Sequence, residues 1–171
     1  MKAIVIYKAG DAQQLQLEER PIPALKEGWT LVKVKGFGIN RSEIFTRQGH
    51  SPSVIFPRIL GIECVGVVEA TTSPTLQKGQ TVVSLMGEMG RAFDGSYAEY
   101  TLLPNGQVYP ITTTLSWKVV QVMVRWWCAL VKRKTLTDFV ENFKKLSLSE
   151  LSPIIKLLEQ TEIEKIRISG D

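Results

Sequence analysis

Almost all glycine and proline residues of this chain lie in its front part. All glycines but Gly170 and all prolines but Pro153 precede residue 111 of the 171 residues. These two residue types mark the turns between short strands, and helix interiors exclude them. The distribution therefore predicts two units, a strand-rich unit over residues 1–115 and a helical segment over residues 116–171.

The front part carries apolar residues in short alternating or β-branched runs, separated by turn residues. The expected strands cover residues 2–7, 14–19, 30–36, 61–70, 81–85 and 96–103. Several short strands at this spacing predict an all-β barrel or sandwich. Residues 41–48 have helical character and follow Asn40, which is a suitable N-cap.

The tail carries apolar residues at helical spacing. Ser116 is expected to cap a helix from Trp117 to about residue 134, followed by one or two more helices. Apolar residues cover most faces of the first helix, which favours a buried or subunit-interface position. Its five basic residues and the pair Trp126–Trp127 leave a membrane-surface or nucleic-acid module as an alternative. The expected fold class is mainly β with a helical tail (α+β).

Charge and cysteine content exclude several classes of protein. Lys plus Arg number 21 and Asp plus Glu 17, a formal charge of +4, so charge alone does not indicate a nucleic-acid partner. Cys64, Cys128 and the single histidine, His50, are too few for a structural Cys/His zinc cage of about four ligands. The start of the chain is a strand pattern, and no apolar stretch reaches the length of a membrane span. We expect a cytoplasmic protein without a transmembrane segment.

Five segments of the front part, in this order and spacing, resemble a known family. They are MKAIVIY (residues 1–7), VKVKGFGINRSEI (32–44), FPRILGIECVGVVEA (56–70), LQKGQTVV (76–83) and GSYAEY (95–100). Together they resemble the N-terminal catalytic domain of medium-chain dehydrogenase/reductases, nearest to the zinc-independent quinone oxidoreductases, over about residues 1–117. The resemblance implies a GroES-like, partly open β-barrel. In the family this barrel precedes a Rossmann domain that binds NADPH, and the active site lies between the two.

The resemblance also indicates the branch of the family. Asn40 and Ile62 match the positions at which zinc-dependent members carry a Cys and a His ligand. Neither a carboxamide nor an aliphatic side chain supplies a thiolate or an imidazole, so no metal site is expected. Without zinc as a Lewis acid, hydride transfer favours an acceptor already activated by conjugation, such as a quinone or an enone. For Asn40 itself, a helix cap and a place beside the nicotinamide are both open.

Other residues of the front part carry similar alternatives. Phe45 matches a position near the substrate that is often Tyr in these reductases, but core packing is the expected role. Arg47 and Arg41 are candidates for a cofactor phosphate, with solvated surface as the alternative. Glu63 lies in an apolar run and is expected to have a structural hydrogen bond or ion pair. Cys64 is expected to be a small core residue.

The sequence contains no turn that would hold a dinucleotide. After residue 106 the only glycine is Gly170, so there is no G-x-G-x-x-G motif and no complete Rossmann domain. The cofactor-binding residues are therefore unknown, and whether the chain is an enzyme by itself is open. One interpretation is a shortened or rearranged quinone oxidoreductase whose cofactor site is completed elsewhere. The alternative is a non-catalytic GroES-like scaffold that self-associates through its tail. In both interpretations, the apolar helix and a barrel without its usual partner domain expose apolar surface. Burial of this surface against a second copy predicts a homo-oligomer, most simply a dimer.

Overall fold

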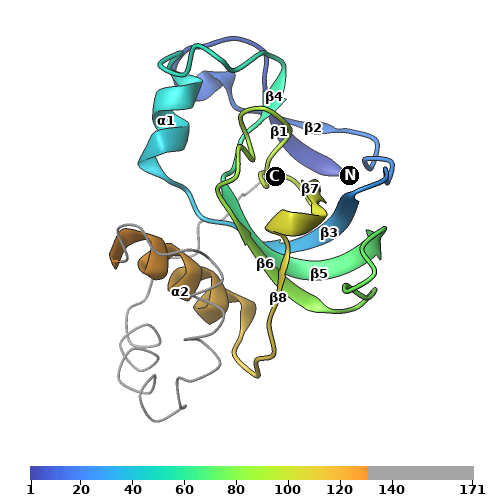
Figure 1. Ribbon diagram of the computed structural model, residues 1–171. Coiled ribbons are helices and arrows are strands. Elements are labelled where there is room, and N and C mark those ends of the chain that lie inside the picture. The colour runs from blue at the N-terminus through green and yellow to red at the C-terminus, as the bar shows by residue number, and fades with distance from the viewer. Residues whose placement is uncertain (131–171) are drawn as a thin grey trace.

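The computed structural model describes residues 1–130, which form two antiparallel sheets and two helices (Figure 1). The three-stranded sheet has the order β2–β1–β4, made of β1 (Lys2–Ile6), β2 (Gln16–Glu19) and β4 (Arg58–Ile59). The five-stranded sheet has the order β7–β3–β5–β6–β8, made of β3 (Trp29–Gly36), β5 (Glu63–Thr71), β6 (Thr81–Leu85), β7 (Tyr100–Pro104) and β8 (Tyr109–Pro110). The helices are α1 (Arg41–Arg47) and α2 (Trp117–Leu130), and Ala12–Gln14 (η1) and Asn105–Gln107 (η2) form short 3₁₀ turns.

The segment before β7 joins the two sheets. Ile4 of β1 donates its backbone N–H to the Tyr97 carbonyl at 2.8 Å, and Val34 of β3 donates to the Glu99 carbonyl at 2.8 Å. The sequence predicts a strand from residue 96 to 103, but the regular strand begins only at Tyr100 because residues 96–99 are shared between the two sheets. This bridging closes the sheets into a partly open barrel and confirms the expected fold class.

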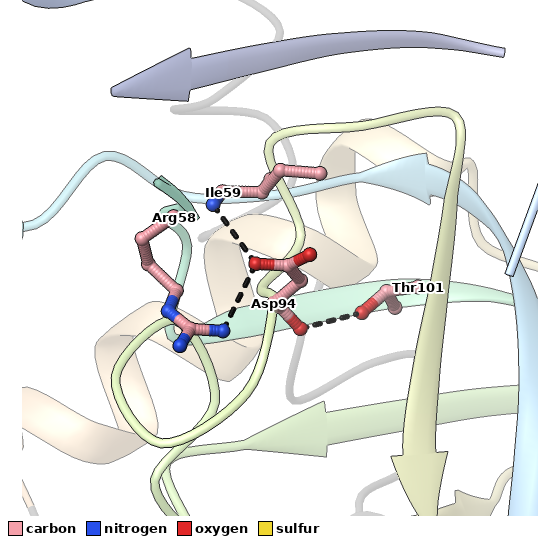
Figure 2. Close-up of polar contacts among 4 residues, drawn as sticks. All are labelled: Arg58, Ile59, Asp94 and Thr101. Atoms are coloured by element: carbon pink, nitrogen blue, oxygen red, sulfur yellow. Dashed lines mark hydrogen bonds and ion pairs between the residues drawn. The ribbon is translucent and has the colours of Figure 1, made fainter. Parts of the chain in front are cut away.

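Asp94 fastens the loop before β7 to β4 (Figure 2). Its Oδ1 accepts hydrogen bonds from Arg58 Nη1 and from the Ile59 backbone N–H, both at 3.1 Å. Its carbonyl oxygen accepts a longer bond from the Thr101 hydroxyl at 3.4 Å. A two-residue strand has little pairing energy of its own, so this carboxylate stabilises the position of β4 against β1.

Three apolar clusters form the core. One fills the barrel around Val32, Val68 and Leu103, and a second lies between the small sheet and Tyr97. The third includes Val120 and Val124 of α2, which are fully buried and pack with apolar residues of β5 and β6. Figure 1 shows α2 beside the large sheet, where it contacts β3 and β5. The predicted burial of this helix is thus confirmed for Val119, Val120 and Val124, whereas Lys118 is exposed.

Some expectations lie beyond this structure. The helices predicted after residue 130 fall outside the described residues. Within residues 1–130, neither helix combines the length and the apolar character needed to cross a bilayer.

Candidate functional site

The candidate site begins at the N-terminus of α1. Asn40 is the N-cap residue, with extended backbone, and Glu43 occupies the third helical position. The Glu43 carboxylate reaches back and accepts the Asn40 backbone N–H at 2.5 Å. Such a contact satisfies one of the N–H groups that a helix start leaves unpaired, which is why an Asn followed three residues later by Glu favours a helix here. The structure confirms Asn40 at the predicted N-cap position, and Glu43 supplies the side-chain contact.

The same carboxylate binds two other parts of the barrel. Glu43 Oε1 accepts the backbone N–H of Ile62 at 2.8 Å, and Oε2 also accepts the hydroxyl of Tyr97 at 2.6 Å. Glu43 is only 3% exposed, and a carboxylate so deeply buried needs such donors. One side chain therefore holds the backbones of Asn40 and Ile62 close together, although they are far apart in the sequence.

Asn40 and Ile62 provide no metal-binding pair. The Ile62 side chain is buried and has no donor atom, while Asn40 offers an amide. Asn40 Nδ2 is buried and has no hydrogen-bond partner among the described residues. An amide N–H donates a hydrogen bond, so its missing partner is a carbonyl or another acceptor oxygen and not a cation. The donor set at these two positions does not fit zinc, which takes thiolate, imidazole or carboxylate ligands.

Phe45 lies on the outside of α1. Its side chain is 44% exposed, so the expectation that it packs in the core is wrong. The ring contacts the imidazole of His50, with centroids 5.9 Å apart, and the guanidinium of Arg41 lies 5.6 Å from its centroid. In a helix this short, one face is enough to bury Glu43 and Thr46, and Phe45 falls on the opposite face. The exposed aromatic surface is consistent with a place near a substrate, which stays a prediction.

Arg47 is placed on a different face of α1 from Phe45. Its Nη1 donates to the Gly10 carbonyl at 2.6 Å, and the Gly10 backbone N–H donates to the Arg47 carbonyl at 2.9 Å. The side chain is half-buried, so solvated surface is the wrong description for Arg47. The structure thus places Arg47 and Phe45 on different faces of α1. It joins the backbones of Asn40 and Ile62 through Glu43.

A second buried carboxylate connects the barrel to α2. Glu63 is 1% exposed, and its Oε1 accepts a hydrogen bond from Gln121 Nε2 at 3.1 Å, which confirms the predicted structural bond. Gln121 Oε1 is buried with no partner among the described residues. The neighbouring Cys64 is also buried, as predicted, and burial, with the nearby charge of Glu63, raises the pKa of its thiol to about 12. A thiol in that state is not a nucleophile at neutral pH.

The sequence interpretation missed Glu43, Tyr97 and Gln121. The spacing of Asn40 and Glu43 is a recognisable capping signal that could have identified Glu43. The partners of the two glutamates carry no such signal, because Tyr97 lies 54 residues from Glu43 and Gln121 lies 58 residues from Glu63.

Comparison with known proteins finds relatives of the β-rich part of the chain. The family model described as the alcohol dehydrogenase GroES-like domain matches residues 26–113. The chain is 30% identical over 122 residues to the quinone oxidoreductase of Sus scrofa, covering 69% of this chain and 36% of that protein. It is 31% identical over 103 residues to a zinc-type alcohol dehydrogenase-like protein of Schizosaccharomyces pombe, covering 60% of this chain and 31% of that protein.

Solved structures show the same fold. The native structure of mycobacterial Rv1454c complexed with NADPH superposes with a TM-score of 0.63 at 23% identity, covering 79% of this chain and 42% of that one. The chain therefore spans about a third of the length of the curated relatives it matches.

Proposed function

We propose that this chain forms the substrate side of a zinc-independent oxidoreductase site. The chain belongs to the family of alcohol dehydrogenase GroES-like domains, as a quinone oxidoreductase-like member of the medium-chain dehydrogenase/reductases. The proposed reaction is hydride transfer from NADPH to a quinone or an enone. The relatives named above support the class of reaction, and the residues at the start of α1 support the branch.

One observation carries the proposal. Glu43 holds the backbones of Asn40 and Ile62 together at the two positions that match the zinc ligands of related enzymes. These residues offer an amide and an aliphatic side chain in place of a thiolate and an imidazole. A substrate carbonyl at this place would be polarised by a hydrogen bond and not by a metal, which suits acceptors that conjugation already activates.

The chain's own residues would act by binding and orienting the acceptor. Asn40 Nδ2 is buried and has no partner among the described residues, and in this proposal it donates to the carbonyl oxygen of the acceptor. The exposed ring of Phe45 on the same helix offers a flat apolar surface to a quinone ring. Arg41, which lies over this ring, is exposed and free to meet an anionic group such as a cofactor phosphate. Arg47 uses its Nη1 on the Gly10 carbonyl, so Arg41 is the residue proposed for this role.

NADPH would supply the hydride when bound. The sequence holds no glycine-rich turn for a pyrophosphate, so the residues described here do not form its binding site. We propose that this turn comes from another polypeptide. We also propose that the protein is a homodimer and lies in the cytoplasm.

The division of the chain into residues 1–115 and 116–171 remains a proposal. Within the described residues, α2 shares the core of the barrel up to Val124.

The first test is a calorimetric titration of the purified chain with NADPH. Saturable binding would support a complete cofactor site, and NADPH oxidation would then be followed with benzoquinone and with an enone. We expect the rate to be unaffected by a metal chelator and to fall about tenfold or more in Asn40→Ala, because a donor to the developing oxyanion is lost. The same substitution at the exposed Gln48, just after α1, is the control and should leave the rate unchanged.

Three outcomes would contradict the proposal. Inhibition by the chelator would contradict zinc independence. An unchanged rate in Asn40→Ala would remove Asn40 from the site. No binding at millimolar NADPH would contradict catalysis by this chain alone and favour the self-associating scaffold.

A further inference from the structure

A trough runs along β1, on the side of α1 away from Phe45. It consists of two adjoining cavities of about 390 Å³ and about 600 Å³, which share Ile4, Phe37 and Tyr97 in their walls. Both volumes fall in the range of about 300–1,000 Å³ that is typical of small-molecule sites. We call this combined feature the β1 trough. Phe45 and Asn40 line neither cavity, but Glu43 and Tyr97 line the smaller one, so the trough lies next to the candidate site and shares these two residues with it.

The lip of the β1 trough is apolar and open to solvent. Leu15 and Ile44 line the smaller cavity and are 37% and 42% exposed, and Ile39 beside them is 49% exposed. Leu17 lines the larger cavity and is 54% exposed. Single exposed apolar residues are common, but a concave group of them marks a place where another apolar molecule binds.

The two ends of the β1 trough differ in charge. The smaller cavity is lined mostly by apolar side chains, together with Glu43, which accepts three hydrogen bonds, and Arg47, whose Nη1 donates to the Gly10 carbonyl. At the larger cavity, the exposed side chains of Lys2 and Lys35 have no ion-pair partner among the described residues. The acid nearby, Glu99, accepts the Lys2 backbone N–H at 2.8 Å.

We propose that the β1 trough binds a medium-chain carboxylate. The carboxylate would lie at the larger cavity between Lys2 and Lys35, where the cations outnumber the single acid. The alkyl chain would run past the shared wall and end under Ile44, in the apolar cavity. This inference does not depend on the proposed oxidoreductase function, because it uses neither Asn40 nor Phe45 and requires no cofactor.

Dodecanoate is the probe for this site, titrated calorimetrically into the full chain below its micelle concentration. We expect saturable binding at one site. Ile44→Glu places a charge in the apolar end and should weaken binding about tenfold or more. The matched control is Ile55→Glu, since Ile55 is 75% exposed and lines neither cavity, and it should bind as the unmodified chain does. Leu17→Glu is a second variant at an exposed position of the trough.

The position of the carboxylate is tested separately. Lys35→Gln should weaken dodecanoate binding and leave dodecanol binding unchanged, whereas Lys8→Gln, an exposed lysine outside both cavities, should affect neither. No saturable dodecanoate binding, or equal weakening by the Ile44 and Ile55 variants, would overturn the proposed site. Equal binding of dodecanoate and dodecyltrimethylammonium would overturn the assignment of the cationic end.

Discussion

Glu43 and Glu63 are both almost fully buried, 3% and 1% exposed, but they hold different parts of the protein. Glu43 takes its donors from Asn40, Ile62 and Tyr97, all within the barrel and its loops. Glu63 takes the amide of Gln121 from α2. An ionised carboxylate is costly to bury without donors, so each glutamate shows where the fold is fixed. Glu43 fixes the candidate site, and Glu63 fixes the contact between barrel and helix.

The largest effect is expected from Glu43→Ala. The change leaves two backbone N–H groups and the Tyr97 hydroxyl without their acceptor inside the protein, so the free energy of unfolding should fall by about 3–5 kcal/mol. Urea denaturation measures this directly. Glu43→Gln keeps one acceptor oxygen and should lose less. A loss below about 1 kcal/mol for the alanine variant would mean that Glu43 does not hold the site.

Gly38→Ala tests the packing around Glu63. A Cβ on Gly38 would overlap Glu63 Oε1, so the carboxylate and its bond to Gln121 must shift. We expect a loss of about 1–3 kcal/mol in the free energy of unfolding. Gly106→Ala is the matched control, because a Cβ there meets nothing within 4 Å, and its effect should stay within about 0.5 kcal/mol. Equal stability of the two variants would show that Glu63 is free to move.

The sequence predicted the parts of this fold that rest on local pattern. The strands β1, β3 and β6 follow apolar or alternating runs, and α1 follows its cap at Asn40. The two-residue strands β4 and β8 were missed, because two residues are too few to show a period. Their places depend on contacts made elsewhere, such as the bonds of Asp94 to Arg58 and Ile59.

The candidate site was only partly predictable for the same reason. The family resemblance paired Asn40 with Ile62, and the structure supplies the carboxylate that joins them. Phe45 was expected in the core, because a phenylalanine in a helix usually packs inward. In a seven-residue helix, however, the buried face is already occupied by Glu43 and Thr46. Such competition for one face depends on tertiary packing and leaves no trace in the local sequence.

Tyr97→Phe compares a buried bond to a glutamate with an exposed one. Tyr97 donates to Glu43 at 2.6 Å in the core, and Tyr7 donates to Glu18 at 2.9 Å on the surface. Losing the buried bond should lower the free energy of unfolding by about 1.5 kcal/mol, since the acceptor is charged and shielded from water. Tyr7→Phe should change it by less than about 0.5 kcal/mol, because water replaces the lost donor. Equal effects of the two substitutions in thermal or urea unfolding would show that water reaches Glu43.

The titration of Cys64 reports whether water reaches the surroundings of Glu63. It is measured through the free energy of unfolding at alkaline pH. Burial raises the pKa of this thiol from about 9 to about 12, and the charge of Glu63 adds to the shift. Between these values the unfolded chain loses the proton and the folded chain keeps it, so the unfolded state binds fewer protons and stability falls as pH rises. Half a pH unit above 9, the loss should be less than about 1 kcal/mol. Cys64→Ala removes the titrating thiol, and its other effects on the free energy of unfolding do not depend on pH. In urea unfolding, the free energy of unfolding should therefore fall less between pH 8 and just above pH 9 in the variant than in the unmodified chain. Identical declines would mean that the Cys64 thiol ionises as readily in the folded barrel as in the unfolded chain, and that the strand carrying Glu63 is open to water.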